Sequence, residues 1–101
     1  MQLRAGQRLK STACDTEMIV VRAPEGDVDV RCGGEPMVAH DADAPKGSVQ
    51  PGFDEGTLLG KRYASEDGGI ELLCTKAGKG SLALGTTPLP RKDAKPLPSS
   101  D

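Results

Sequence analysis

The chain has almost no aromatic residues and a single histidine. Its 101 residues include one Phe, one Tyr, no Trp and one His. The core must therefore come from aliphatic side chains and methionine, each of which stabilises a fold by roughly 1.5–3 kcal/mol when fully buried. Such a core is thin, and chains of this size often add a metal, a disulfide or a second subunit. We expect one small domain that forms a homodimer.

The sequence also lacks a long apolar run and an excess of basic residues. No stretch approaches the roughly 18 apolar residues of a membrane span, and the start, MQLRAGQRLK, holds no apolar core of an export signal. Lys and Arg number 13 against 15 Asp and Glu, which does not favour nucleic-acid binding. We expect a cytoplasmic protein that binds neither membranes nor nucleic acid.

An internal repeat is present instead. A shift of 54 positions places residues 6–30 on residues 60–84 without a gap, with six identical positions. Average composition gives roughly one or two identities by chance. After this stretch the second copy is two residues shorter. We interpret residues 6–37 and 60–89 as two copies of one supersecondary unit.

Each copy has the pattern of β-strands. The apolar runs TEMIVVRA (16–23) and IELLCTKA (70–77) are each followed by a glycine-containing turn signal and then an alternating segment. In DVDVRC (27–32), Val30 and Cys32 fall on one face and the charged residues on the other. The pattern predicts that residues 16–23 and 27–32 form a hairpin, with Cys32 pointing inward.

These patterns predict an all-β protein, a small antiparallel sandwich or barrel made of two three-stranded units. The expected domain covers residues 1–89. Within it, residues 38–57 are rich in Asp, Pro and Gly and predict a linker, and its part 40–56 would be a lid if the protein binds a small molecule. The proline-rich residues 90–101 predict a flexible tail.

Residues 11–38 resemble a known metal-binding motif. The stretch CDTEMIVVRAPEGDVDVRCGGEPM, which begins at Cys14, is similar to desulforedoxin and the N-terminal domain of desulfoferrodoxin. Their pattern is C-x-x-C, a strand and a glycine-containing turn, then C-C-G-x-P-M. Cys14 and Cys32 match two of the four cysteines, whereas Ser11 and Gly33 replace the other two. The resemblance implies a rubredoxin-like knuckle, often dimeric, but without the four thiolates of an iron or zinc centre.

Three interpretations of Cys14 and Cys32 stay open from the sequence. They are small buried residues of a scaffold without metal, or they form a disulfide, or they bind zinc or iron. In the last case the remaining ligands come from His40, the only histidine, or from the same cysteines of a second chain. We expect Cys74, in the middle of an apolar run, to be a core residue.

No arrangement typical of catalysis is present in the sequence. There is no recognisable Ser/His/Asp or Cys/His spacing, and GKGS (78–81) lacks the rest of a P-loop, so we expect a hairpin turn there. We therefore expect a non-enzymatic accessory protein, without a cofactor, that pairs strand edges with itself or with a protein partner. The alternatives are a metal-binding or redox protein that uses Cys14 and Cys32, and a small-molecule binding module.

Overall fold

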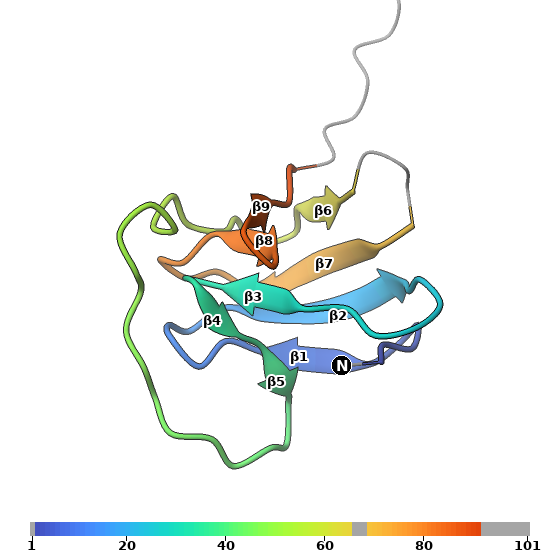
Figure 1. Cartoon of the computed structure of the whole chain (residues 1–101), viewed down its shortest axis with the longest axis horizontal. Helices are drawn as coiled ribbons and strands as arrows, with labels where there is room; N and C mark the ends of the chain where they lie inside the picture. The colour runs from blue at the N-terminus through green and yellow to red at the C-terminus, as the bar shows by residue number, and fades with distance from the viewer. Residues whose placement is uncertain (1, 66–68, 92–101) are drawn as a thin grey trace, which may run out of the picture.

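The computed structural model describes residues 2–65 and 69–91, which form nine short strands. The strands are β1 Arg8–Lys10, β2 Glu17–Arg22, β3 Val30–Cys32, β4 Glu35–Pro36, β5 Val38–Ala39, β6 Arg62–Ala64, β7 Glu71–Lys76, β8 Leu82–Leu84 and β9 Thr87–Pro88. They build two antiparallel sheets, in the orders β5-β1-β2-β7-β6 and β4-β3-β8-β9 (Figure 1). The all-β prediction is confirmed. These residues contain no helix, and hence none long and apolar enough to cross a membrane.

Each sheet is centred on two strands from different halves of the chain. β2 pairs with β7, and β3 pairs with β8, in both cases antiparallel. The central residue pairs are Ile19 with Leu73 and Arg31 with Ala83. On the two sides of each central pair, equivalent residues of the two copies exchange their roles as partners. The strand pairing therefore has the pattern of a twofold axis that passes through these two residue pairs.

The hairpin expected between residues 16–23 and 27–32 is wrong, because β2 and β3 lie in different sheets. The same holds for β7 and β8, so GKGS lies in a crossover between the sheets rather than in a hairpin turn. Each of these strands has one apolar face. When two strands lie in opposite sheets of a sandwich, their apolar faces cover each other. Two strands that pair side by side in one sheet do not cover each other's apolar faces.

The repeat also runs in a different register in its second part. β1 and β2 match β6 and β7 at an offset of 54, but β3 matches β8 at an offset of 52. The gap-free alignment is therefore wrong beyond β2, since the connection 77–81 is two residues shorter than its counterpart 23–29. Each half also adds a short fourth strand, so the units are not three-stranded.

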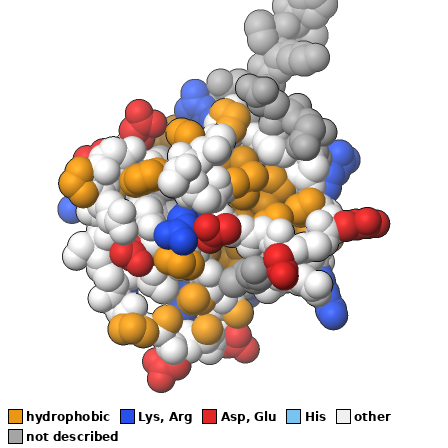
Figure 2. Space-filling view, viewed as in Figure 1, with side chains coloured by type: hydrophobic (Ala, Val, Ile, Leu, Met, Phe, Trp, Pro, Cys, Tyr) orange, Lys and Arg blue, Asp and Glu red, His pale blue; other side chains and the backbone are white. Residues whose placement is uncertain are grey.

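The core lies between the two sheets and is almost entirely aliphatic. Its fully buried side chains include those of Leu9, Met18, Val20, Cys32, Leu72 and Cys74. Cys32 points inward and Cys74 is a core residue, both as expected, with exposed fractions of 0% and 1%. On the face drawn in Figure 2, apolar side chains are visible near the middle, and acidic and basic side chains are scattered around them.

The start of the linker and the end of the domain differ from the expected boundaries. Val38 and Ala39 form β5 on β1, so the linker begins at His40. At the end of the domain, the backbone N–H of Ala64 donates to Pro90 O at 3.0 Å, and Arg91 forms a β-bridge with Tyr63. Sheet pairing thus extends two residues beyond position 89. The rest of the expected tail, 92–101, lies outside the described residues.

Candidate functional site

Cys14 and Cys32 meet at one end of the sandwich. Cys14 lies in the loop 11–16 that joins β1 to β2 in the five-stranded sheet, and Cys32 ends β3 of the four-stranded sheet. Their Sγ atoms are 3.8 Å apart, and both thiols are free. Cys32 is fully buried, whereas Cys14 is partly exposed. The site therefore consists of a reachable thiol in contact with a buried one.

Ser11 shapes the loop that carries Cys14. Its buried Oγ accepts hydrogen bonds from the backbone N–H groups of Ala13 and Cys14, at 3.0 and 3.2 Å. This local turn is typical of serine and fixes the backbone just before the thiol. The same oxygen lies 3.5 Å from Cys14 Sγ. Ser11 thus acts as a turn former beside the thiol of Cys14.

The crossover 77–81 closes the site from the second half of the chain. The backbone N–H of Gly80 donates to Cys14 Sγ at 3.4 Å. A Cβ at Gly78 would overlap Thr16, and a Cβ at Gly80 would lie 2.8 Å from the Cα and N atoms of Gly33. Neither Gly78 nor Gly80 has a positive φ, so close packing is what requires glycine here. The sequence reasoning missed this role of GKGS.

Two buried threonines lie on the inner side of Cys14. Thr16 Oγ1 lies 3.2 Å from Cys14 Sγ and 2.8 Å from Thr57 Oγ1. The backbone N–H of Gly78 donates to Thr57 Oγ1 at 3.1 Å. Thr16 and Thr57 are only 0% and 3% exposed, so their hydroxyls depend on these protein partners. The sequence offers no signal for this pair, because the two threonines are 41 residues apart.

These contacts separate the acidities of the two thiols. Burial raises the pKa of Cys14, but hydrogen bonds from Ser11, Thr16 and the N–H of Gly80 outweigh it and lower the pKa to about 7. At Cys32, burial and the neighbouring charge of Cys14 raise the pKa to about 12. Near neutral pH, roughly half of Cys14 is therefore the nucleophilic thiolate, while Cys32 keeps its proton.

We expect iodoacetamide to alkylate Cys14 with a pH midpoint near 7, because the lowered pKa supplies thiolate at a lower pH than in an ordinary cysteine. Cys32 and Cys74 should stay unmodified while the protein is folded, since both are buried. Mass spectrometry of tryptic peptides measures all three rates at once. A Cys14 midpoint near 8.5, the value of an unperturbed thiol, would contradict this pKa assignment.

His40 does not join the two cysteines. Its Nε2 lies 3.2 Å from Glu17 Oε1, and Glu17 Oε2 lies 3.8 Å from Lys76 Nζ. The backbone N–H of His40 donates to Arg8 O, which keeps this residue beside β1. Within residues 2–65 and 69–91, no three His, Cys, Asp or Glu side chains are grouped so that they can hold a metal ion.

The thiol pair alone does not make a closed metal site. Two thiolates on a tetrahedral zinc ion would be about 3.8 Å apart, which the pair matches. The other nearby groups are the hydroxyls of Ser11 and Thr16, which are not usual zinc ligands. At Gly33, a cysteine would need a φ of 68° and its Cβ would lie 3.0 Å from that of Ala13. The residues present therefore do not fit a four-thiolate centre.

Part of the linker runs across this end of the molecule, on the left in Figure 1. We call residues 46–57 the strap. Its backbone is hydrogen-bonded to each of the three loops that surround the thiols. The bonds run from the N–H of Gly47 to Thr12 O, of Gln50 to Gly33 O and of Thr57 to Gly78 O, at 2.6, 2.8 and 3.0 Å. The strap therefore connects the loops that position Cys14 and Cys32.

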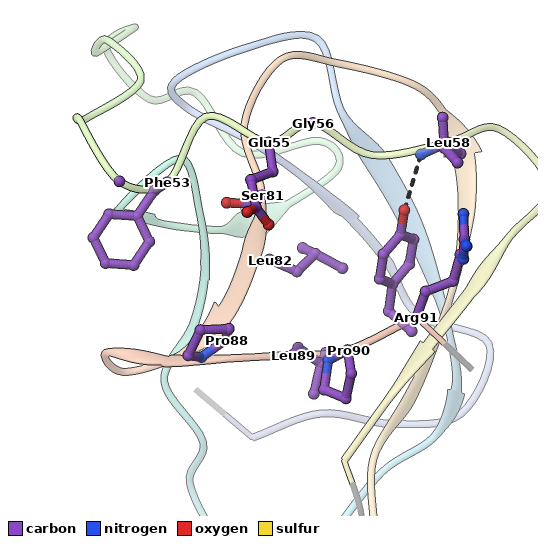
Figure 3. Close-up of a pocket in the computed structure, with 12 residues that line it drawn as sticks. Phe53, Glu55, Gly56, Leu58, Ser81, Leu82, Pro88, Leu89, Pro90 and Arg91 are labelled. Carbon is purple, nitrogen blue, oxygen red and sulfur yellow. Dashed lines mark hydrogen bonds between the residues drawn. The ribbon is translucent and has the colours of Figure 1, made fainter. Parts of the chain in front are cut away.

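The strap also lines an open groove of about 470 Å³ (Figure 3). The two aromatic residues of the chain, Phe53 and Tyr63, both line it, together with the buried Leu82 and Leu89. The hydroxyl of Tyr63 accepts a hydrogen bond from the backbone N–H of Leu58 at 3.0 Å. Residues 52–56 of the expected lid thus form one wall of a groove with an apolar floor.

Comparison with known proteins supplies no relative that would assign a role to this site. The desulforedoxin resemblance of residues 11–38 therefore stays a prediction. The chain matches no protein-family model, no curated protein and no solved structure.

Proposed function

We propose that this chain is a small accessory protein whose reactive group is the Cys14–Cys32 dithiol. Disulfide-containing substrates oxidise this dithiol to an intramolecular disulfide. The observation that carries the proposal is the 3.8 Å contact between a partly exposed thiol and a buried one. A disulfide bond is about 2.0 Å long, so closure requires the two sulfurs to approach by roughly 1.8 Å. The loop 11–16 has to make this movement, since Cys32 is held at the end of a strand.

The reaction proceeds by two thiol–disulfide exchanges. The Cys14 thiolate attacks one sulfur of the substrate disulfide, forms a mixed disulfide and releases the first thiolate. Cys32 then loses its proton to solvent and attacks Cys14 Sγ, which releases the second thiolate. The protein loses two electrons and two protons, and one substrate disulfide becomes two thiols. Because burial disfavours the Cys32 thiolate, the second exchange should accelerate as the pH rises.

Oxidised glutathione is a suitable probe of this reaction. Reduced protein at pH 8 should release two equivalents of glutathione per chain and keep one thiol, that of Cys74, which is alkylated only after unfolding. In the matched Cys32→Ala variant, the reaction should stop at a stable mixed disulfide on Cys14 after one equivalent. If the unsubstituted chain also stops at the mixed disulfide, or does not react, the dithiol function is wrong.

The same protein preparation tests the metal-binding alternative. We measure zinc and iron by mass spectrometry after anaerobic purification, beside a Cys14→Ser/Cys32→Ser variant. We expect little retained metal, because the groups next to the two thiols are hydroxyls, which are not usual zinc ligands. A stoichiometric metal that the double variant loses would replace the redox function by a metal site.

The proposal includes a homodimer or a protein partner and a cytoplasmic location, where the pair would be reduced at rest. The outer strands of the four-stranded sheet contain Pro36 and Pro88, which cannot donate a ladder hydrogen bond. Pairing through an edge is therefore better supported at the five-stranded sheet. Light scattering of the reduced and oxidised forms tests the dimer and shows whether it depends on the thiols.

A further inference from the structure

We propose that Thr57 of the strap is a positioning residue for the reactive thiol, because it completes a one-directional hydrogen-bond relay that ends at Cys14. This inference rests on the proposed dithiol function and names a residue outside the thiol loops on which the reactivity of Cys14 depends. Three observations carry it, namely the distances along the relay, the burial of its members and the attachment of the strap.

The direction of the relay follows from the thiolate form of Cys14, which can only accept a hydrogen bond. Thr16 Oγ1, 3.2 Å from Cys14 Sγ, then donates its hydrogen to the sulfur. Either hydroxyl could donate between Thr16 Oγ1 and Thr57 Oγ1, which are 2.8 Å apart, but the Thr16 hydrogen is already in use, so Thr57 donates there. The Thr57 hydroxyl in turn accepts from the backbone N–H of Gly78 at 3.1 Å. Each bond polarises the next one, which strengthens the last donation to the sulfur.

Burial makes this relay depend on Thr57. Thr16 and Thr57 are 0% and 3% exposed, so water does not readily replace a missing hydroxyl. Without the Thr57 hydroxyl, Thr16 Oγ1 would lose its donor, and its own hydrogen would be a weaker donor to Cys14. The Gly78 N–H would lose its acceptor as well. The effect at Cys14 should therefore exceed that of removing an ordinary surface hydrogen bond.

The strap brings Thr57 to this position. Its backbone N–H donates to Gly78 O at 3.0 Å, so Thr57 and Gly78 bind each other twice. Other groups that bear on the Cys14 charge are the thiols of Cys32 and Cys74, which the pKa causes include. On the exposed side lies the ion pair of Asp15 with Lys46 at 3.5 Å. Thr57 also hydrogen-bonds to the Cys74 thiol, and Thr16 to the Cys32 thiol, so the test follows the alkylation of each cysteine separately.

The test compares the pH profile of Cys14 alkylation in four chains. In Thr57→Val, the midpoint should rise by about half to one pH unit, and the rate at pH 7 should fall roughly two- to five-fold. Thr57→Ser, which keeps the hydroxyl, should restore the midpoint. Tyr63→Phe removes the neighbouring bond to Leu58 N–H and should leave the midpoint unchanged. Thr57→Ala takes the place of Thr57→Val if the latter does not fold.

An unchanged midpoint in folded Thr57→Val or Thr57→Ala would overturn the relay, as would a Tyr63→Phe shift of the same size. These outcomes are distinct from a failure of the dithiol function, which the reaction of the unsubstituted chain with oxidised glutathione measures. A chain without the Thr57 hydroxyl can still close the disulfide, only more slowly at neutral pH.

Discussion

Replacing Gly80 by alanine is expected to lower the free energy of unfolding by about 3 kcal/mol. The added Cβ would lie 2.8 Å from two backbone atoms of Gly33 and 3.2 Å from Cys14 Sγ. Gly33 cannot move away easily, because its N–H donates to Ser81 O and its carbonyl accepts from Gln50. The crossover 77–81 would have to shift outward, which also breaks the bond from the Gly80 N–H to Cys14.

Denaturant unfolding under reducing conditions measures this loss, and Gly47→Ala is the matched control. At Gly47 the nearest atom to an added Cβ is Glu35 Cγ at 3.5 Å, an ordinary contact. The control should change the stability by less than about 0.5 kcal/mol. The Gly80 variant should also show a higher pKa of Cys14. Equal stabilities of the two variants would show that the crossover does not pack against Gly33 as described.

Oxidation of Cys14 and Cys32 to a disulfide is expected to stabilise the fold by about 3 kcal/mol. The two residues are 18 positions apart, and the bond would restrict the unfolded chain accordingly. For a domain of this size, such a change raises Tm by roughly 15 °C. The bond would also join the five-stranded sheet to the four-stranded sheet at one end.

Thermal unfolding of the reduced and oxidised proteins, followed by circular dichroism, measures this stabilisation. Cys14→Ser, treated with the same oxidant, is the control and should show no increase in Tm. A Cys74→Ala variant should keep the full increase, because Cys74 is not part of the pair. A lower Tm of the oxidised chain would mean that closing the bond distorts the site more than it restricts the unfolded chain.

The fold class and the inward faces of the strands could be predicted from the sequence. Alternation in the segment 27–32 placed Cys32 in the core, and the apolar run 70–77 did the same for Cys74. Both predictions use only the two-residue period of a strand, which is a local property. The offset of 54 between the two copies also matched β1 with β6 and β2 with β7.

Strand partners could not be predicted in the same way. Pairing of β2 with β7 and of β3 with β8 joins residues 49 or more positions apart. Local patterns favour a hairpin between neighbouring strands whenever a turn signal separates them. Here the turn signals at 23–29 and 77–81 serve crossovers, and the shorter crossover shifts the register of the second copy.

The candidate site was only partly visible in the sequence. Cys14 and Cys32 stood out by their resemblance to a metal-binding pattern, and the structure brings them together. The same reasoning suggested His40, which instead contacts Glu17. Thr57 gave no signal, since one threonine in a linker without periodicity has no local pattern. Its role depends on a contact across the whole fold.

The most direct test of the account is to map the disulfide in oxidised protein. Trypsin places the three cysteines on separate peptides, 11–22, 32–46 and 63–76, because each peptide follows a Lys or Arg and ends in one. After mild oxidation, denaturation, alkylation and digestion without reduction, we expect one linked pair, 11–22 with 32–46, and alkylated Cys74 in 63–76. Links that involve Cys74, links between two chains, or three alkylated cysteines would contradict the central claim that Cys14 and Cys32 are redox partners.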